Sequence, residues 1–184
     1  MITARSLWTD LTAIRAQQPV VLNLTNYVVM NSTANALLAA GASPIMAHAP
    51  DELEDMVGLA SSVVINIGTL DQPWIESMRL AARLAHQHDK PWVLDPVGAG
   101  ASELRTATSL ELIEAGRPSV IRGNASEILA LCRVDASTRG VDSAACSSDA
   151  ENVAVDFAKQ MGAVVSVSGQ PDLVADERGA VHIC

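Results

Sequence analysis

The chain has 184 residues, 49% of them hydrophobic, and a formal net charge of −9 from 12 basic and 21 acidic side chains. This length and apolar content predict one folded domain with a sizeable core and exclude a disordered chain. The acidic balance argues against a nucleic-acid partner, because phosphate backbones are bound by clustered Lys and Arg.

The cysteine pattern and the hydropathy of the sequence favour a cytoplasmic location. The three cysteines, Cys132, Cys146 and Cys184, are scattered and odd in number, which suits a reducing compartment better than a disulfide framework. The sequence contains no signal-peptide pattern, and no stretch approaches the roughly 20 apolar residues of a membrane span. We therefore expect no membrane partner.

Helical and strand patterns alternate along most of the chain. Helices are predicted at 6–18, 31–40, from 50, from 73, 102–115, after 127 through 131 and at 149–160, and strands at 20–25, 44–47, 62–68, 91–94, 119–121 and 163–169, followed by a hairpin over 173–183. Asn31 or Ser32 is the expected cap of the second helix, and 133–147 is the longest predicted loop. The alternation predicts an α/β fold, a doubly wound and mostly parallel sheet flanked by helices, in a single domain over 1–184.

The stretch 92–100, Trp-Val-Leu-Asp-Pro-Val-Gly-Ala-Gly, ends an apolar strand in one carboxylate. In an open α/β sheet, ligands bind outside the carboxyl ends of the strands, so Asp95 is expected at the lip of a crevice. The glycines that follow allow a close approach of backbone to ligand. The alternative is an ordinary turn with a solvated Asp, because Asp, Pro and Gly are common turn residues.

Polar and glycine residues recur where successive predicted strands stop. They are Asn26, then Asn66 with Gly68 and Thr69, then Asp95, then Arg122 with Asn124 and Glu127, then Ser168 with Gly169. The carboxylates of Asp95 and Glu127 can hold Mg²⁺, and the fork of Arg122 suits a phosphate. Together they indicate phosphoryl transfer. The alternatives are that Glu127 supports the start of a helix and that Arg122 pairs with a nearby acid.

Two nucleotide-binding motifs do not fit. The sequence has no G-x-x-x-x-G-K-[ST] segment, which excludes a P-loop protein. Gly98-Ala99-Gly100 imitates the start of a dinucleotide fingerprint, but Glu103 occupies the position of the third glycine.

Six segments carry a resemblance to a known family. They are Asn-Leu-Thr-Asn at 23–26, Ser-Thr-Ala-Asn at 32–35, Gly-Ala-Ser-Pro at 41–44, Asn-Ile-Gly-Thr-Leu at 66–70, Leu-Asp-Pro-Val-Gly at 94–98 and Ile-Arg-Gly-Asn-Ala-Ser-Glu at 121–127. In this order they closely resemble hydroxyethylthiazole kinase, of the ribokinase-like superfamily. The last segment is the most specific, and the resemblance runs from the first predicted strand to residue 184.

The resemblance implies a function and a set of site residues. The function is the ATP- and Mg²⁺-dependent phosphorylation of the hydroxyl of 4-methyl-5-(2-hydroxyethyl)thiazole, a salvage step to thiamine, by a homotrimer with the thiazole pocket between subunits. Carried over by position, the thiazole-binding residues are Met46, Asn26 and Gly68, the ATP-binding residues are Arg122, Ser168 and Asn124, and the acidic residues near metal and phosphates are Asp95 and Glu127. The alternative for Met46 is core filling, the commoner use of methionine.

One expected segment has no match in these 184 residues. The family has a Gly-Thr-Gly-Cys segment at a helix N-terminus, which supplies an anion hole and a catalytic cysteine; Cys184 does not match it, because no glycines precede it. We therefore assign no catalytic side chain and expect a C-terminally incomplete chain with little or no kinase activity and one sheet face uncovered. The alternatives are a non-catalytic thiazole-binding remnant or regulator of a full-length kinase, and a kinase for another small alcohol such as a hydroxymethylpyrimidine.

Overall fold

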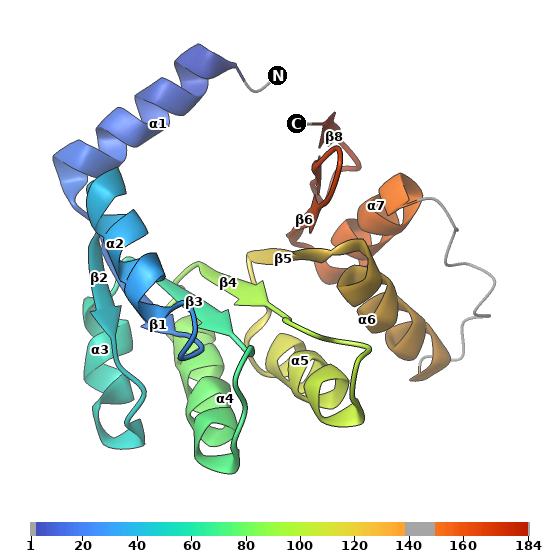
Figure 1. Ribbon diagram of the computed structural model, residues 1–184, viewed down its shortest axis with the longest axis horizontal. Coiled ribbons are helices and arrows are strands. Elements are labelled where there is room, and N and C mark those ends of the chain that lie inside the picture. Colours follow the sequence, from blue (N-terminus) through green and yellow to red (C-terminus); the bar gives the residue numbers. More distant parts are fainter. Residues whose placement is uncertain (1–2, 139–149, 184) are drawn as a thin grey trace. The chain divides into compact units, whose positions relative to one another are not determined.

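A computed structural model describes residues 3–138 and 150–183 (Figure 1). The chain divides into two compact units, residues 1–92 and residues 93–184. We call them the first and the second unit and describe each by itself. The organisation of the whole chain as a single domain stays a prediction.

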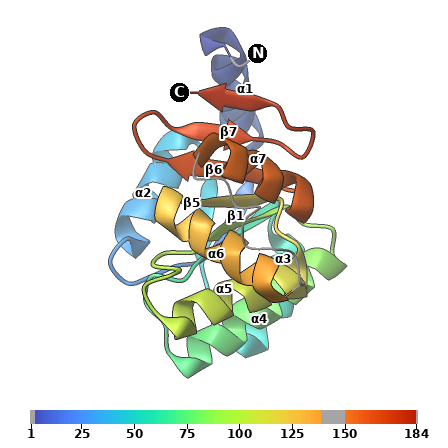
Figure 2. The ribbon, with the colours of Figure 1, turned by 90° about the vertical axis from the view of Figure 1, so that its right-hand side faces the viewer.

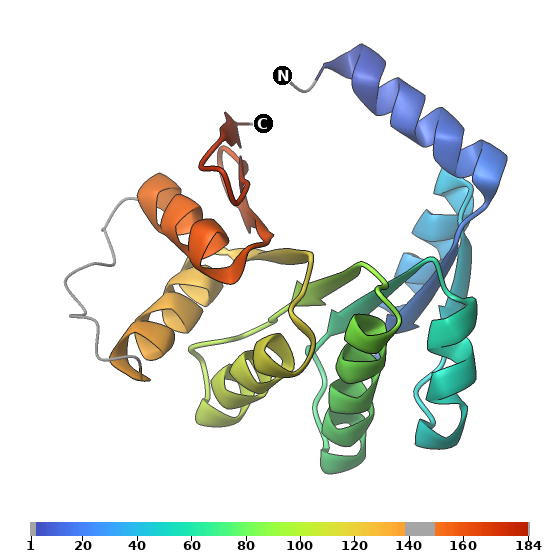
Figure 3. The same ribbon diagram turned by 180° about the vertical axis from the view of Figure 1, so that it is seen from behind.

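The first unit is a parallel sheet with helices on both faces. Its elements are α1 (Ala4–Gln17), β1 (Val20–Leu24), α2 (Met30–Ala40), β2 (Ser43–Met46), the 3₁₀ helix η1 (Pro50–Glu52), α3 (Leu53–Leu59), β3 (Ser62–Asn66) and α4 (Gln72–Gln87). The strand order is β2-β1-β3, all parallel. The connections β1 to β2 and β2 to β3 run in opposite directions across the sheet, so right-handed crossovers place α2 and α3 on opposite faces. Figures 1 and 3 show this arrangement from the two sides.

The core of the first unit lies between the sheet and α4. Leu22, Val63 and Ile65 of the strands are fully buried, as are Met78 and Ala82 on the inner face of α4. Two features stabilise the N-terminus of α4. The Asp71 carboxylate accepts a hydrogen bond from the backbone N–H of Trp74 at 2.8 Å, and Pro73 occupies the first turn.

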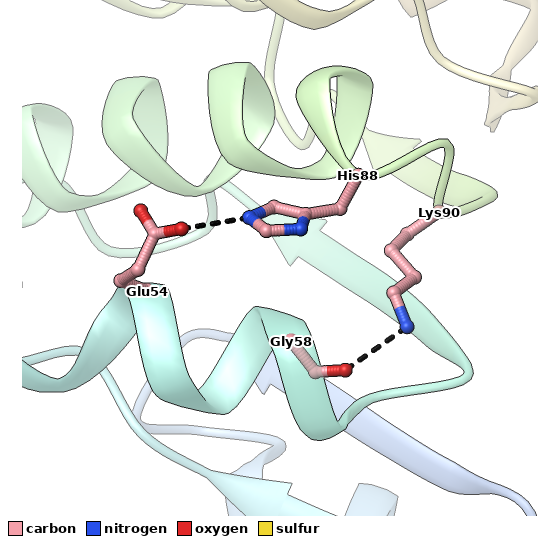
Figure 4. A network of polar contacts seen from close by, with 4 residues as sticks. All are labelled: Glu54, Gly58, His88 and Lys90. Atoms are coloured by element: carbon pink, nitrogen blue, oxygen red, sulfur yellow. Dashed lines mark hydrogen bonds and ion pairs between the residues drawn. The ribbon is translucent and has the colours of Figure 1, made fainter.

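Two polar contacts join α3 to the end of α4 (Figure 4). His88 Nε2 lies 2.8 Å from Glu54 Oε1, and Lys90 Nζ donates to the carbonyl of Gly58 at 3.0 Å. Both contacts are exposed, so they add little stability and mainly orient the two helices.

The second unit combines a parallel sheet with a C-terminal antiparallel hairpin. Its elements are β4 (Trp92–Asp95), which starts at the last residue of the first unit, α5 (Glu103–Gly116), β5 (Val120–Asn124), α6 (Ala125–Thr138), α7 (Ala150–Met161), β6 (Val164–Ser168), β7 (Leu173–Ala175) and β8 (Val181–Ile183). β4, β5 and β6 are parallel neighbours, and β7 and β8 continue the sheet antiparallel to them. Figure 2 shows the hairpin beside α7.

Helices cover one face of the second unit's sheet. Ile121 and Val165 of the strands pack against Ile128 and Leu131 of α6 and Phe157 of α7. Along β5 and β6, the residues between the buried positions are half-buried or exposed. The connections from β4 to β6 all run in one direction across the sheet, which places their helices on one face. Within the described residues of this unit, no helix covers the other face.

The predicted order of helices and strands is confirmed, but the extent of α6 differs from the prediction. The sequence predicts a loop over 133–147, but α6 continues to Thr138. Residues 134–138 contain no Gly or Pro to stop a helix, and the first glycine comes at 140. The remainder of that predicted loop, 139–147, lies outside the described residues, as does residue 149, the predicted first residue of the next helix.

Candidate functional site

In the first unit, three residues at the carboxyl ends of β1 and β3 form one hydrogen-bonded network. Asn26 Nδ2 donates to Asn66 Oδ1 at 2.7 Å, and the backbone N–H of Gly68 donates to the same oxygen at 2.9 Å. Both asparagine side chains are buried. The family resemblance predicts that Asn26 and Gly68 belong to a substrate pocket, and the structure brings these two residues together.

Gly68 has no room for a side chain. A Cβ atom at this position would lie 2.5 Å from Asn26 Nδ2 and 2.8 Å from Asn26 Cγ. Both atoms belong to a side chain that is fixed by its own hydrogen bonds. The close approach of Asn26 therefore requires glycine here.

The start of α2 corrects a prediction. Neither Asn31 nor Ser32 caps this helix; it begins at Met30, and its cap position, Val29, makes no side-chain hydrogen bond. Instead, Asn26 Oδ1 accepts the backbone N–H groups of Val28 at 2.9 Å and Val29 at 3.1 Å. An Asx turn before the helix therefore replaces the expected cap, and it also fixes the orientation of the Asn26 side chain.

Met46 lies at the same edge of the sheet as Asn26. It is the last residue of β2 and pairs with Asn23 of the adjacent strand β1, three residues before Asn26. Met46 is half-buried.

Three aromatic rings at this edge form a cluster that the sequence analysis did not identify. His48 stacks on Trp74 with ring centroids 4.4 Å apart and planes 10° apart, and Tyr27 meets Trp74 edge-on at 5.7 Å. Trp74 Nε1–H donates to Tyr27 Oη at 2.8 Å. The three residues come from different loops and helices, so spacing in the sequence carries no signal of their contact.

In the second unit, the predicted nucleotide residues lie on neighbouring strands. Val93 and Leu94 pair with Val120 and Ile121, so the next position along β4, Asp95, comes beside Arg122. On the other side, β5 pairs Arg122 with Ser166 and Asn124 with Ser168. These positions alternate with the buried ones and belong to the face without helices, where Arg122 is exposed and Asp95 and Ser168 are half-buried.

Glu127 occupies the N-terminus of α6. Its Oε2 accepts the backbone N–H of Asn124 at 2.8 Å, and Asn124 Oδ1 accepts the backbone N–H of Glu127 at 3.0 Å, which is a reciprocal capping box. Glu127 Oε1 accepts the backbone N–H of Gly98 at 2.8 Å. Glu127 therefore supports the start of the helix, the alternative considered from the sequence, and it also holds the loop that follows Asp95.

The loop after β4 is held in a defined conformation. Gly98 and Gly100 have φ angles of 76° and 88°, which side chains rarely adopt. Arg105 Nη1 donates to the carbonyl of Val97 at 2.6 Å, and the backbone N–H of Gly100 donates to Thr106 Oγ1 at 2.8 Å. An open pocket of about 480 Å³ lies between this loop and α6, lined by Gly98, Ala101, Asn124, Ser126, Glu127 and Arg133 among others.

The structure defines the class of the protein. Adenosine kinase from Schistosoma mansoni, solved with tubercidin, superposes with a TM-score of 0.54 at 16% identity over 92% of this chain and 61% of its own. This likeness shows the fold alone, that of the ribokinase-like α/β proteins. In the described residues, 3–138 and 150–183, no helix is long and apolar enough to cross a membrane.

The closer relatives define the family. The model of the hydroxyethylthiazole kinase family matches residues 11–184, and the chain belongs to this family. Hydroxyethylthiazole kinase of Nitratidesulfovibrio vulgaris DP4 is 56% identical over 176 residues, 96% of this chain and 66% of the relative. The structure of the hydroxyethylthiazole kinase protein from Pyrococcus horikoshii OT3 superposes with a TM-score of 0.85 at 45% identity, over 95% of this chain and 65% of that one. The chain thus spans just under two thirds of the length of these relatives.

Proposed function

We propose that the protein phosphorylates the hydroxyl of 4-methyl-5-(2-hydroxyethyl)thiazole with ATP, a salvage step to thiamine. The observation that carries this proposal is family membership across residues 11–184 together with the Asn26–Asn66–Gly68 network. In that network every polar group named above already has a partner, so the loops after β1 and β3 are ordered before substrate binds. Pre-ordering lowers the cost of binding a small ligand.

The thiazole-binding residues of this proposal are Met46, Asn26 and Gly68. Met46 offers a polarisable thioether to a flat sulfur-containing ring. Gly68 lets the Asn26 side chain pack directly against its backbone, and Asn66 Oδ1 accepts hydrogen bonds from both residues, so the position of the Gly68 backbone is fixed. The proposed substrate is uncharged and small, which agrees with a site built from amides and a thioether.

The ATP-binding residues of this proposal are Arg122, Ser168 and Asn124, with Mg²⁺ near Asp95 and Glu127. A guanidinium fork on an open sheet face suits a phosphate chain. The described residues contain no cluster of three or more acidic, His or Cys side chains that could hold a metal. Mg²⁺ is usually bound by one or two carboxylates plus water and substrate phosphates, so two carboxylates fit it. When bound, Mg²⁺ would offset the negative charge of the phosphates.

We also propose a homotrimer with the thiazole pocket between subunits. The surface that supports an oligomer is formed by α1 and α2, neither of which contains a buried residue. Leu7, Trp8 and Leu38 on these helices are each more than half exposed, and Val28 before α2 is almost fully exposed. Exposed apolar surface of this kind commonly marks a protein interface. A cytoplasmic location belongs to the same proposal and agrees with the odd number of scattered cysteines in the sequence.

Calorimetry and a coupled ADP-release assay test the proposal on the 184-residue chain. We expect saturable binding of the thiazole alcohol, and binding of ATP in the presence of Mg²⁺. Because these residues contain no Gly-Thr-Gly-Cys segment, we expect slow turnover, so that the chain alone acts as a thiazole-binding protein. Ordinary turnover would overturn the expectation about activity. Absence of thiazole binding, or binding of only an unrelated alcohol such as a hydroxymethylpyrimidine, would overturn the proposed substrate.

A further inference from the structure

Trp74 is a buried ring that joins two loops at one edge of the first unit. Its side chain is 4% exposed, although it belongs to the first turn of α4, where exposed residues are common. One of its contacts is the stacked ring of His48, and the other is the edge of Tyr27, whose hydroxyl accepts the indole N–H. A buried indole N–H needs a partner, and Tyr27 provides it.

Each loop held by Trp74 carries a candidate substrate residue. Tyr27 follows Asn26 directly in the chain, and His48 lies two residues after Met46. Both loops leave adjacent parallel strands, β1 and β2. The third loop of this edge, which contains Gly68, runs into α4 and ends at the Asp71 cap that bonds the N–H of Trp74 itself. Trp74 therefore lies where the three loops that carry the candidate substrate residues meet.

We propose that Trp74 is a positioning residue for substrate binding: it fixes the loops of Asn26 and Met46 through Tyr27 and His48. This inference rests on the proposed function for the identity of the ligand. Trp74 does not have to touch the ligand in this arrangement. Loops that Trp74 did not hold would have to become ordered when the thiazole alcohol binds, and this cost would lower the affinity. By holding the loops, Trp74 raises the affinity for the thiazole alcohol.

The outer parts of the two held rings are open. Tyr27 is 60% exposed even though its hydroxyl is bonded, and His48 is exposed as well. A ring that is anchored at one end and exposed at the other is restrained without being part of the core. This is the property expected of side chains that position a pocket wall rather than stabilise the fold.

Calorimetry on conservative variants of the full chain tests the positioning role. Trp74→Phe removes the N–H donor and keeps an aromatic ring, and Tyr27→Phe removes the acceptor. Each variant is expected to raise the Kd for the thiazole alcohol roughly fivefold to tenfold, the effect of one lost hydrogen bond, with the Kd for ATP unchanged. The double variant is expected to be no worse than either single variant, because both remove the same bond.

Two controls separate positioning from general damage. Trp92→Phe makes the same chemical change at an equally buried tryptophan, which lies at the amino end of β4, and it is expected to leave thiazole binding unchanged. His48→Phe is expected to retain the stacking and the affinity, whereas His48→Ala is expected to lose both. Equal weakening by Trp92→Phe and Trp74→Phe would overturn the inference.

Amide hydrogen exchange supplies a readout that needs no ligand. Trp74→Phe is expected to speed exchange at Val28 and Val29, whose N–H groups are bonded to Asn26, and Trp92→Phe is not. If the unaltered chain binds no thiazole alcohol, the proposed function fails, and exchange still decides whether Trp74 fixes the loops. Unchanged exchange in Trp74→Phe, or unchanged affinity where the unaltered chain binds, would overturn the inference.

Discussion

Glu127 Oε1 accepts the backbone N–H of Gly98 at 2.8 Å, which joins the loop after β4 to the first turn of α6. The other oxygen of the same carboxylate accepts the N–H of Asn124. One side chain thus fixes two backbone groups, those of Gly98 and Asn124, that lie 26 positions apart in the sequence. In the proposed function, both groups border the nucleotide.

Glu127→Ala is expected to lower the free energy of unfolding by about 1–3 kcal/mol, because it removes a cap and leaves two backbone N–H groups without their acceptor. Urea unfolding followed by circular dichroism measures this change. Glu127→Gln keeps one amide oxygen for one of the two N–H groups, so its loss is expected to be smaller. Equal stability of the unaltered chain and Glu127→Ala would show that the carboxylate does not hold the loop.

Gly68→Ala is expected to destabilise the first unit and weaken thiazole binding. A Cβ there meets the fixed amide of Asn26 at 2.5 Å, so the Asn26–Asn66 hydrogen bond has to move. Gly58→Ala is the matched control, since nothing lies within 4 Å of its Cβ position in α3. That variant is expected to gain up to about 1 kcal/mol of stability, because alanine favours a helix. Thermal unfolding of both variants gives the comparison, and equal effects would contradict it.

Arg122→Ala is expected to weaken ATP binding at least tenfold without lowering stability, because the side chain is exposed on the open sheet face. Arg122→Lys is expected to restore only part of the affinity, since a lysine lacks the planar fork. Arg178→Ala, in the exposed β7–β8 turn, keeps the same net charge as Arg122→Ala and is expected to bind ATP normally. Isothermal calorimetry with ATP and Mg²⁺ measures all three. Identical losses in Arg122→Ala and Arg178→Ala would point to a general charge effect instead.

The hydrogen bonds of Asp176 predict that the stability of the β7–β8 turn depends on pH. The backbone N–H of Ala180 at 2.8 Å, and that of Arg178 at 2.9 Å, donate to its carboxylate and hold the pKa of Asp176 below its ordinary value of 3.8. A lowered folded-state pKa stabilises the turn above pH 3.8, and this contribution is lost as the pH falls through the folded-state pKa.

Asp176→Asn keeps an oxygen acceptor but does not titrate. It is expected to abolish the part of the pH dependence that arises from this turn, in the acid range below pH 3.8. Unfolding midpoints of both proteins across that range test this, and an NMR titration of the Asp176 carboxyl checks the pKa directly. Parallel stability curves, or a pKa of 3.8 or higher, would contradict the assignment.

Most of the fold could be predicted because the signals were local. Apolar β-branched runs mark the strands, and Pro73 marks the start of α4. The end of α6 was missed because its last residues are polar yet contain no helix breaker. The start of α2 differs from the prediction because Asn26, before the helix, accepts the backbone N–H groups of Val28 and Val29, and neither Asn31 nor Ser32 caps the helix.

Part of the grouping of the candidate site residues could be predicted from the geometry of a parallel sheet. Residues that end adjacent strands must share an edge, so Asn26 and Gly68, or Arg122 and Ser168, could be grouped from the sequence. The contact of Tyr27, His48 and Trp74 depends on how side chains from three segments pack, which no local pattern encodes. The two roles of the Glu127 carboxylate likewise depend on tertiary contact with Gly98.

The most direct measurement is a calorimetric titration of the protein with 4-methyl-5-(2-hydroxyethyl)thiazole, made on the unaltered chain and on Asn26→Ala. We predict saturable binding to the unaltered chain and a large loss of affinity in the variant, because Asn26 orders both the Gly68 backbone and the start of α2. Undetectable binding to the unaltered chain, or equal affinity in the two proteins, would contradict the assignment of this edge as the thiazole site.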